Sequence, residues 1–215
     1  MKLNPFIYLA RVMLVCAIVC TGCSNITRAP TPTLPVEDSD LPTPASTLTE
    51  LLKNISSDDM GVRLVSIYAL EKYGNDAAPA IPTLIENLYV DDFDVRTAAA
   101  YALGKLGPTA RLAIPDLTNV LDNNKEYYHA RVTTAEALGR IGDPAAIPAL
   151  AKALFRENTQ PYELAISCAE SIAQITNERF TDIGSLVYTL DEKGVPLIVK
   201  DARNWWVEKG QYQDW

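Results

Sequence analysis

The chain has 215 residues, of which 48% are hydrophobic and 21% are charged, so it is long enough to fold around a substantial core. Its formal net charge of −8 leaves no basic surface for phosphate backbones and argues against binding nucleic acid. Only one histidine is present, and three of the four cysteines (Cys16, Cys20 and Cys23) lie close to the N-terminus. We therefore expect neither a Cys/His metal cluster nor a disulfide framework, and no cofactor.

Residues 1–22 have the organisation of a signal peptide. Lys2 and Arg11 supply a basic start, and an apolar run over residues 12–20 follows. This run is far shorter than the roughly 20 residues that a membrane-spanning helix needs. Two alternatives remain open: an uncleaved signal anchor whose helix extends back to Phe6, and secretion without a lipid.

The residues after the apolar run point to a lipid anchor. Thr21-Gly22-Cys23 resembles the lipobox of bacterial lipoproteins, although Cys20 stands where such motifs usually carry an aliphatic residue. The resemblance implies lipidation of Cys23 and an exported, membrane-anchored protein on the periplasmic or extracellular face. Residues 23–46 are rich in Pro, Thr and Ser and are predicted to form an extended tether. Loss of residues 1–22 would lower the formal charge from −8 to −10.

A repeat runs through the middle of the sequence. The pentad Ala-Ile-Pro-x-Leu begins at Ala80, Ala113 and Ala146, so that the interval between successive copies is the same both times. Two further features precede each pentad in the same order. They are a glycine at the end of an apolar segment (Gly74, Gly107 and Gly142) and, further upstream, an arginine (Arg63, Arg96 and Arg131).

Each unit is predicted to be a helical hairpin. The first helix carries apolar residues at helical spacing, as between Val95 and Leu106, and Asp94 is the expected N-cap. The glycine ends this helix, since it can adopt positive φ, and the proline of the pentad lies in the first turn of the second helix.

The pattern resembles HEAT repeats, specifically the short HEAT-like type of the phycobilisome lyases. The resemblance covers residues 47–176 and implies an all-α fold, a right-handed α-solenoid of helical hairpins. Residues 47–52 are expected to form the second helix of a truncated leading unit. Residues 162–176 are expected to form a fourth first helix, in which Ala165 replaces the arginine and Thr176 the glycine. The solenoid should therefore end there.

The resemblance favours a structural role for the arginines, as a ladder that bonds acidic or carbonyl groups of the adjacent unit. Asp59 and Asp92, each four residues before an arginine, are nearby acceptors; ligand-binding arginines are the alternative. Some HEAT-like proteins are di-iron hydroxylases, but this chain has one histidine, His129, and no His-Glu pair. We interpret His129 as a surface residue at a helix start and Cys168 as a buried structural cysteine. Phycobilin-lyase activity is not expected of an exported protein.

Two functional classes remain: a lipid-anchored scaffold that binds a protein partner at the cell envelope, and an accessory subunit or assembly factor of an envelope enzyme. Neither makes the chain itself catalytic, because it lacks a titratable cluster. The resemblance implies that the second helices line the partner-binding face. The candidate contact residues there are Glu50, Lys53, Asn54, Glu86, Asn87, Asp116, Asn119 and Lys152.

Residues 177–215 close the chain. Residues 177–194 lose the repeat pattern, and residues 196–210 are predicted to form a helix with Gly210 at its C-cap. Trp205 and Trp206 lie on its apolar face. We expect one of them to cap the last repeat, because a solenoid end exposes an apolar side; the alternative is a contact with a partner.

Overall fold

The computed structural model describes residues 47–156, 162–180, 190–191 and 193–215. The signal peptide, Cys23 and the tether of residues 23–46 lie outside these ranges. In the described ranges the regular structure is helical, and the only β-type pairing is an isolated bridge between Leu190 and Pro196. None of the described helices is both long and apolar enough to cross a membrane. The helices are α2 (Leu48–Asn54), α3 (Met60–Ala69), α4 (Ile81–Asn87), α5 (Phe93–Lys105), α6 (Ile114–Asp122), α7 (Tyr128–Ile141), α8 (Ile147–Arg156), α9 (Glu163–Thr176) and α10 (Leu197–Glu208).

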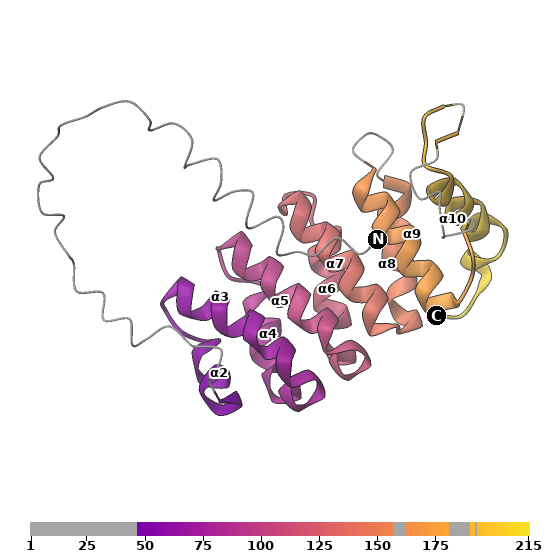
Figure 1. The fold of residues 1–215 in the computed structure, drawn as a ribbon. Coiled ribbons are helices and arrows are strands. Elements are labelled where there is room, and N and C mark those ends of the chain that lie inside the picture. The colour runs from indigo at the N-terminus through magenta and orange to yellow at the C-terminus, as the bar shows by residue number, and fades with distance from the viewer. Residues whose placement is uncertain (1–46, 157–161, 181–189, 192) are drawn as a thin grey trace, which may run out of the picture. The chain divides into compact units, whose positions relative to one another are not determined.

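The helices between Leu48 and Glu208 belong to one compact part of the chain, and they stack as an α-solenoid in two layers. α3, α5, α7 and α9 pack side by side in chain order and form the first layer (Figure 1). α2, α4, α6 and α8 form the second layer, and Figure 1 shows α6 and α8 behind the first layer. Each helix of the second layer also packs against the first-layer helix that follows it in the chain. The predicted all-α solenoid of helical hairpins is confirmed, and α2 and α9 are helices where residues 47–52 and 162–176 were expected to form them.

Glycine and proline shape each hairpin turn as predicted. Gly74, Gly107 and Gly142 have φ of 51°, 56° and 75°, which an L side chain rarely adopts. A 3-10 stretch follows the first helix of each unit and leads to the second helix: Leu70–Ala80, Gly107–Ala113 and Pro144–Ala146. The proline of each pentad then stands in the first turn of α4, α6 or α8, where its missing N–H leaves no hydrogen bond unmade.

The core repeats with the same period as the sequence. Each helix of the second layer completely buries a leucine at the same position of the repeat, and these leucines recur at the interval that separates the pentads: Leu51, Leu84, Leu117 and Leu150. Burying one such side chain stabilises the fold by roughly 1.5–3 kcal/mol. Each repeat therefore buries its apolar face against its neighbour rather than within itself.

Small residues bring the first-layer helices close together. A Cβ added at Gly104 of α5 would lie 2.8 Å from the Cα of Ala137, and one added at Gly139 of α7 would lie 2.6 Å from the Oγ of Ser171. The Ser171 hydroxyl donates to the Ala135 carbonyl at 2.8 Å across the same interface. The sequence pattern did not single out these two glycines.

Some predicted helix ends were wrong. Asp92, not Asp94, caps α5: its Oδ1 accepts from the Val95 N–H at 2.9 Å, because the helix begins at Phe93. α9 ends in the same way as the earlier first helices, but the residue with positive φ is Asn177, at 56°. Thr176, which was expected to replace the glycine, is the last residue of the helix.

The C-terminal helix α10 covers the last repeat. It packs against α8 and α9, which confirms a capping helix. Trp205 is 9% exposed among the rings of Phe180, Trp206 and Trp215, and Trp206 is half-buried. Gly210 is not the C-cap; α10 ends at Glu208, and an added Cβ at Gly210 would lie 2.6 Å from the Trp206 ring.

Candidate docking cleft between repeats

The repeated arginines bind backbone carbonyls where the second helix of one unit leads into the next unit. Arg63 Nε donates to the Ser57 carbonyl at 2.7 Å, and Arg131 Nε donates to the Leu121 carbonyl at 3.1 Å. Arg96 Nη1 donates to the carbonyls of Val90 and Asp91 at 2.8 and 2.9 Å.

The acceptors lie in or after the last turn of a second-layer helix. The acceptor of Arg131 lies in the last turn of α6, where carbonyls have no partner within the helix and carry the negative end of its dipole, so the guanidinium stabilises them. The acceptors of Arg63 and Arg96 lie in the loops after α2 and α4. The predicted ladder thus uses carbonyl acceptors. Asp59 and Asp92 are not its acceptors, because their carboxylates cap α3 and α5 instead.

Arg203 of α10 completes the same series at the end of the solenoid. Its Nη2 and Nε donate to the Leu154 carbonyl at 2.7 and 3.2 Å. Leu154 stands one repeat interval after Leu121, the acceptor of Arg131. α9 has Ala165 where its predecessors carry arginine, so α10 supplies the missing guanidinium.

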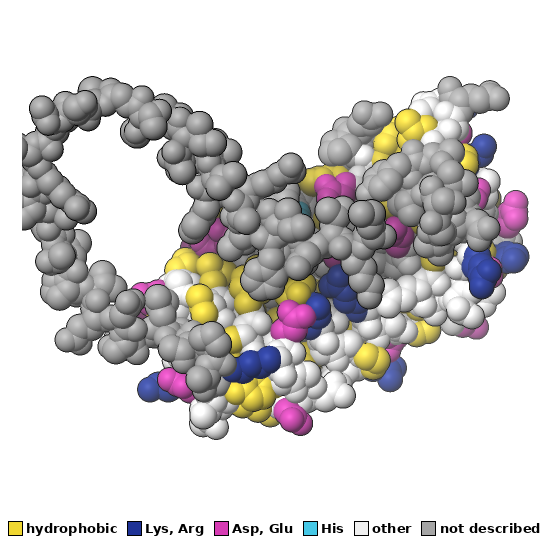
Figure 2. Space-filling view, viewed as in Figure 1, with side chains coloured by type: hydrophobic (Ala, Val, Ile, Leu, Met, Phe, Trp, Pro, Cys, Tyr) yellow, Lys and Arg dark blue, Asp and Glu magenta, His cyan; other side chains and the backbone are white. Residues whose placement is uncertain are grey.

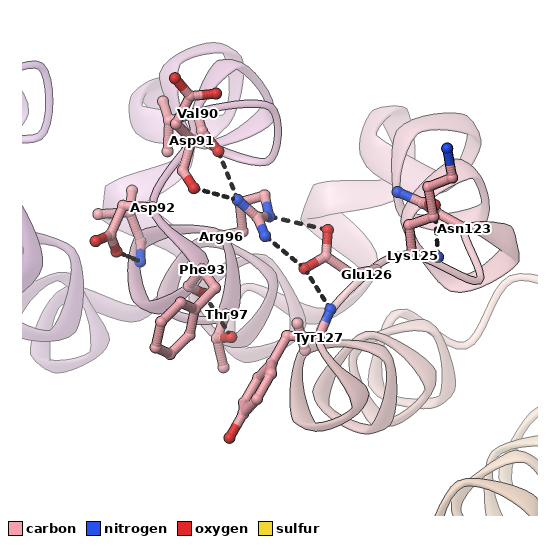
Figure 3. A network of polar contacts seen from close by, with 12 residues as sticks. Val90, Asp91, Asp92, Phe93, Arg96, Thr97, Asn123, Lys125, Glu126 and Tyr127 are labelled. Atoms are coloured by element: carbon pink, nitrogen blue, oxygen red, sulfur yellow. Dashed lines mark hydrogen bonds and ion pairs between the residues drawn. The ribbon is translucent and has the colours of Figure 1, made fainter.

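Arg96 also joins two consecutive inter-repeat loops. Its Nη2 and Nε donate to the two carboxylate oxygens of Glu126 at 2.7 and 2.9 Å, as Figure 3 shows. The two side chains are 17% and 6% exposed, and Glu126 Oε1 also accepts from the Tyr127 N–H at 2.9 Å. A paired guanidinium and carboxylate of this kind fixes both distance and orientation, so the two loops are held in a defined geometry.

A cleft of about 290 Å³ lies between these loops and the ends of α4 and α6. The Arg96–Glu126 pair forms part of its wall. Polar and charged groups line most of the remainder, and the lining residues include Tyr89, Asp91, Asn119, Asn123 and Lys125. Figure 3 shows Asn123 and Lys125 on one side of the ion pair and Val90 and Asp91 on another.

Asn119 is the predicted contact residue that lines the cleft, and it is exposed. Asp116, one turn earlier, accepts a hydrogen bond from the Tyr89 hydroxyl at 2.7 Å. The pKa of Tyr89 is raised by partial burial and by this carboxylate. The hydroxyl therefore remains a hydrogen-bond donor at the mouth of the cleft.

Asn87 was wrongly predicted to be a contact residue. It is 4% exposed, and its Nδ2 donates to the Ile55 carbonyl at 2.9 Å, so its amide satisfies the end of α2. Lys152 is exposed and forms an ion pair with Asp122 at 2.7 Å. Glu50, Lys53 and Glu86 are exposed and Asn54 is half-buried, and none of these four lines the cleft.

The remaining predicted residues take simple positions. His129 is exposed in the first turn of α7, and Cys168 is fully buried on α9, as expected. In the described part of the chain, no group of three or more His, Cys, Asp and Glu side chains is placed to hold a metal ion.

Family comparisons agree with the repeat. The profile described as HEAT repeats matches residues 45–128, and the profile described as PBS lyase HEAT-like repeat matches residues 130–156. The chain is a HEAT-repeat protein. No curated protein sequence matches it.

Solved structures show the same fold. Human deoxyhypusine hydroxylase in complex with glycerol matches this HEAT-repeat protein with a TM-score of 0.51 and 24% identity, over 72% of this chain and 51% of the hydroxylase. The chain thus spans about half the length of that enzyme. An engineered protein matches with a TM-score of 0.53 and 19% identity, over 73% and 78% of the two chains. The CpcE–CpcF complex of phycocyanin lyase from Nostoc sp. PCC7120 matches with a TM-score of 0.41 and 22% identity, over 74% and 71%.

Proposed function

We propose that this HEAT-repeat protein is a lipid-anchored, non-catalytic scaffold that binds a protein partner at the cell envelope. The observation that carries the proposal is the cleft of about 290 Å³ between consecutive repeats, with its wall fixed by the buried Arg96–Glu126 pair. A concave, preorganised surface with polar groups on flanking loops is suited to receive side chains of another protein.

The sequence supports the anchor and the location. Cys23 follows a short apolar segment, and a Pro/Thr/Ser-rich stretch separates it from the first repeat helix at Leu48. At roughly 3 Å per residue, such a stretch would hold the repeats several tens of Å from a membrane surface. A scaffold in this position presents its cleft to proteins of the envelope.

Site-specific photo-cross-linking tests the proposal. A photoreactive residue at Asn119 in the full-length chain should give one discrete cross-linked product in envelope membranes, because Asn119 lines the cleft. The matched position is Glu208, which is exposed at the end of α10 and lies outside the cleft lining; it should not give that product. The absence of a product from Asn119, or the same products from both positions, would contradict the proposal.

The cross-linked protein also separates the two functional classes. A catalytic subunit in the product would make the chain an accessory factor of an envelope enzyme. A partner without catalytic activity would favour a scaffold in the narrower sense. Both outcomes leave the role of the cleft unchanged.

A further inference from the structure

Apolar side chains stand exposed at the beginning of three consecutive first-layer helices. Met60 opens α3, Phe93 opens α5 and Tyr127 directly precedes α7, at intervals that match the repeat to within one position. Their exposed fractions are 42%, 44% and 53%. We call these three residues the apolar ridge. One exposed apolar side chain is ordinary for a protein surface, whereas several that gather on one face mark an interaction site.

The apolar ridge continues across the repeats. The Phe93 and Tyr127 rings are 4.8 Å apart between centroids, and Figure 3 shows both on one side of the Arg96–Glu126 pair. Tyr68 of α3, which is 49% exposed, is near enough to the first turn of α5 for the Asp94 carboxylate to raise its pKa, after the larger effect of partial burial. Figure 2 shows hydrophobic side chains gathered over α3 and α5.

The charges beside the apolar ridge are mainly negative. Asp58 and Asp94 are exposed beside Met60 and Phe93 in the sequence, and neither forms an ion pair with another residue of the described ranges. The nearby guanidinium of Arg96 is turned inward to loop carbonyls and Glu126. Lys125 is the exposed cation of the neighbouring loop, so the carboxylates predominate.

We infer that the apolar ridge binds a cationic amphipathic segment of the partner protein, an inference that rests on the proposed function. Apolar side chains of the segment would cover Met60, Phe93 and Tyr127, and its lysines or arginines would pair with the flanking carboxylates. Such complementary charges raise association rates and disfavour partners of the wrong sign.

The same charges argue against two other occupants. A second copy of this chain would bring a net charge of −8 and a second set of ridge carboxylates to the contact. The chain's own tether, residues 23–46, carries Arg28 against Glu37, Asp38 and Asp40, so it is also acidic. Like charges placed together across an interface oppose binding.

Fluorescence anisotropy with two labelled peptides tests the inference. One is an amphipathic peptide of leucine and lysine, and the other replaces every lysine with glutamate. The protein used is the full-length chain with Cys23→Ser, which removes the lipid acceptor. It should bind the lysine peptide, and its affinity for the glutamate peptide should be at least tenfold lower. Raising the salt concentration from about 50 to about 300 mM should weaken the lysine complex several-fold, because exposed charges are screened.

Variants locate the binding. The double variant Phe93→Ala, Tyr127→Ala should weaken the lysine complex about tenfold or more, because buried aromatic side chains usually contribute most of the binding free energy of an interface. Asp58→Asn with Asp94→Asn should weaken it several-fold. Two controls change exposed residues at the C-terminal end. Tyr212→Ala is the control for the aromatic variant, and Glu208→Gln with Asp214→Asn is the control for the charge variant. Both should bind the lysine peptide as the parent does. Circular dichroism confirms that each variant is folded.

Equal affinity for both peptides, no binding of the lysine peptide, or ridge variants that bind like the parent would overturn the inference. These results are independent of cross-linking from Asn119. If Asn119 gives a discrete cross-linked product but the ridge variants bind the peptides as the parent does, only the inference of a cationic segment is refuted. Failure at Asn119 refutes the role of the cleft, whatever the peptides show.

Discussion

At the scale of single residues, a recurring set of polar contacts between repeats ends on backbone carbonyls in or after the last turn of a second-layer helix. The arginines of α3, α5 and α7 bond them from the following first helix, and Arg203 does so from α10. A parallel set acts within the second layer: Asn87 bonds the Ile55 carbonyl, and Arg156 bonds the carbonyls of Leu121 and Asp122. Each bond joins a unit to the end of the unit before it, so it stabilises the stack rather than one hairpin.

Replacement of Arg203 tests this interpretation. Arg203→Ala removes two hydrogen bonds to the Leu154 carbonyl and the contact of the guanidinium with the Phe155 ring. It should lower the free energy of unfolding by about 1–3 kcal/mol, because the helix-end carbonyl loses a charged partner. Urea denaturation provides the measurement.

The control for Arg203 is Arg111→Ala. Arg111 forms an ion pair with Asp143 at 2.6 Å, but its side chain is 75% exposed. The expected loss is therefore below about 1 kcal/mol. Equal losses in the two variants would show that Arg203 acts only as a surface charge.

At the scale of helices, the separation of neighbouring first-layer helices depends on two glycines. Gly104 faces Ala137 and Gly139 faces Ser171 at distances that leave no room for a Cβ. α7 packs extensively against both α5 and α9, so both of these close helix–helix contacts involve α7. The alanines of α5 that are fully buried, Ala98, Ala99 and Ala100, serve the same close packing.

Gly139→Ala reverses the sign that helix propensity alone predicts. Alanine in a helix interior is about 1 kcal/mol more favourable than glycine. At Gly139 the new Cβ would lie 2.9 Å from the Cα of Ser171, which cannot move without the helix, so we expect a net destabilisation of about 1–3 kcal/mol. At Gly61 an added Cβ meets only the Asp59 carboxylate at 3.3 Å, and Gly61→Ala should be neutral or stabilising. Stabilisation by both, measured as melting temperature, would contradict the packing described for α7 and α9.

The cap helix gives a second prediction at this scale. Trp205→Ala should cost about 3–5 kcal/mol, because Trp205 is buried among three aromatic rings and its Nε1 donates to Glu178 at 3.2 Å. Trp206→Ala should cost less, since Trp206 is half-buried. Thermal unfolding distinguishes the two. Unchanged melting temperatures in both variants would assign the pair to a partner contact rather than to the cap.

The sequence predicted what the repeat period encodes. The glycines with positive φ, the prolines of the second helices and the evenly spaced buried leucines were all visible in it. The N-cap of α5 was ambiguous, because Asp92 and Asp94 both precede Val95. Arg203 could not be found from the pattern, since its acceptor, the Leu154 carbonyl, is too far back along the chain to fit the period. Asn87 looked like a surface residue because its partner, the Ile55 carbonyl after α2, lies one repeat earlier in the chain.

At the scale of the whole molecule, the repeats hold a fixed cleft and an exposed ridge next to one another. The Arg96–Glu126 pair belongs to both, since it walls the cleft and lies close in the chain to Phe93 and Tyr127. Nearest-neighbour packing extends this geometry along the stack, and α10 closes its C-terminal end. This organisation is consistent with the proposed scaffold, which would position another protein. The proposed lipid on Cys23 would hold the chain and its partner at a membrane.

Co-recovery of the partner after membrane fractionation tests the proposed scaffold most directly. The full-length chain, its Cys23→Ser variant and an Asn119→Ala, Asn123→Ala variant are each isolated from the membrane and soluble fractions, and the protein cross-linked at the cleft is quantified in each. We expect Cys23→Ser to move both the chain and its partner to the soluble fraction. The cleft variant should stay in the membrane fraction without the partner. A Cys23→Ser chain that remains in the membrane fraction, or a cleft variant that retains its partner, would contradict the proposed scaffold.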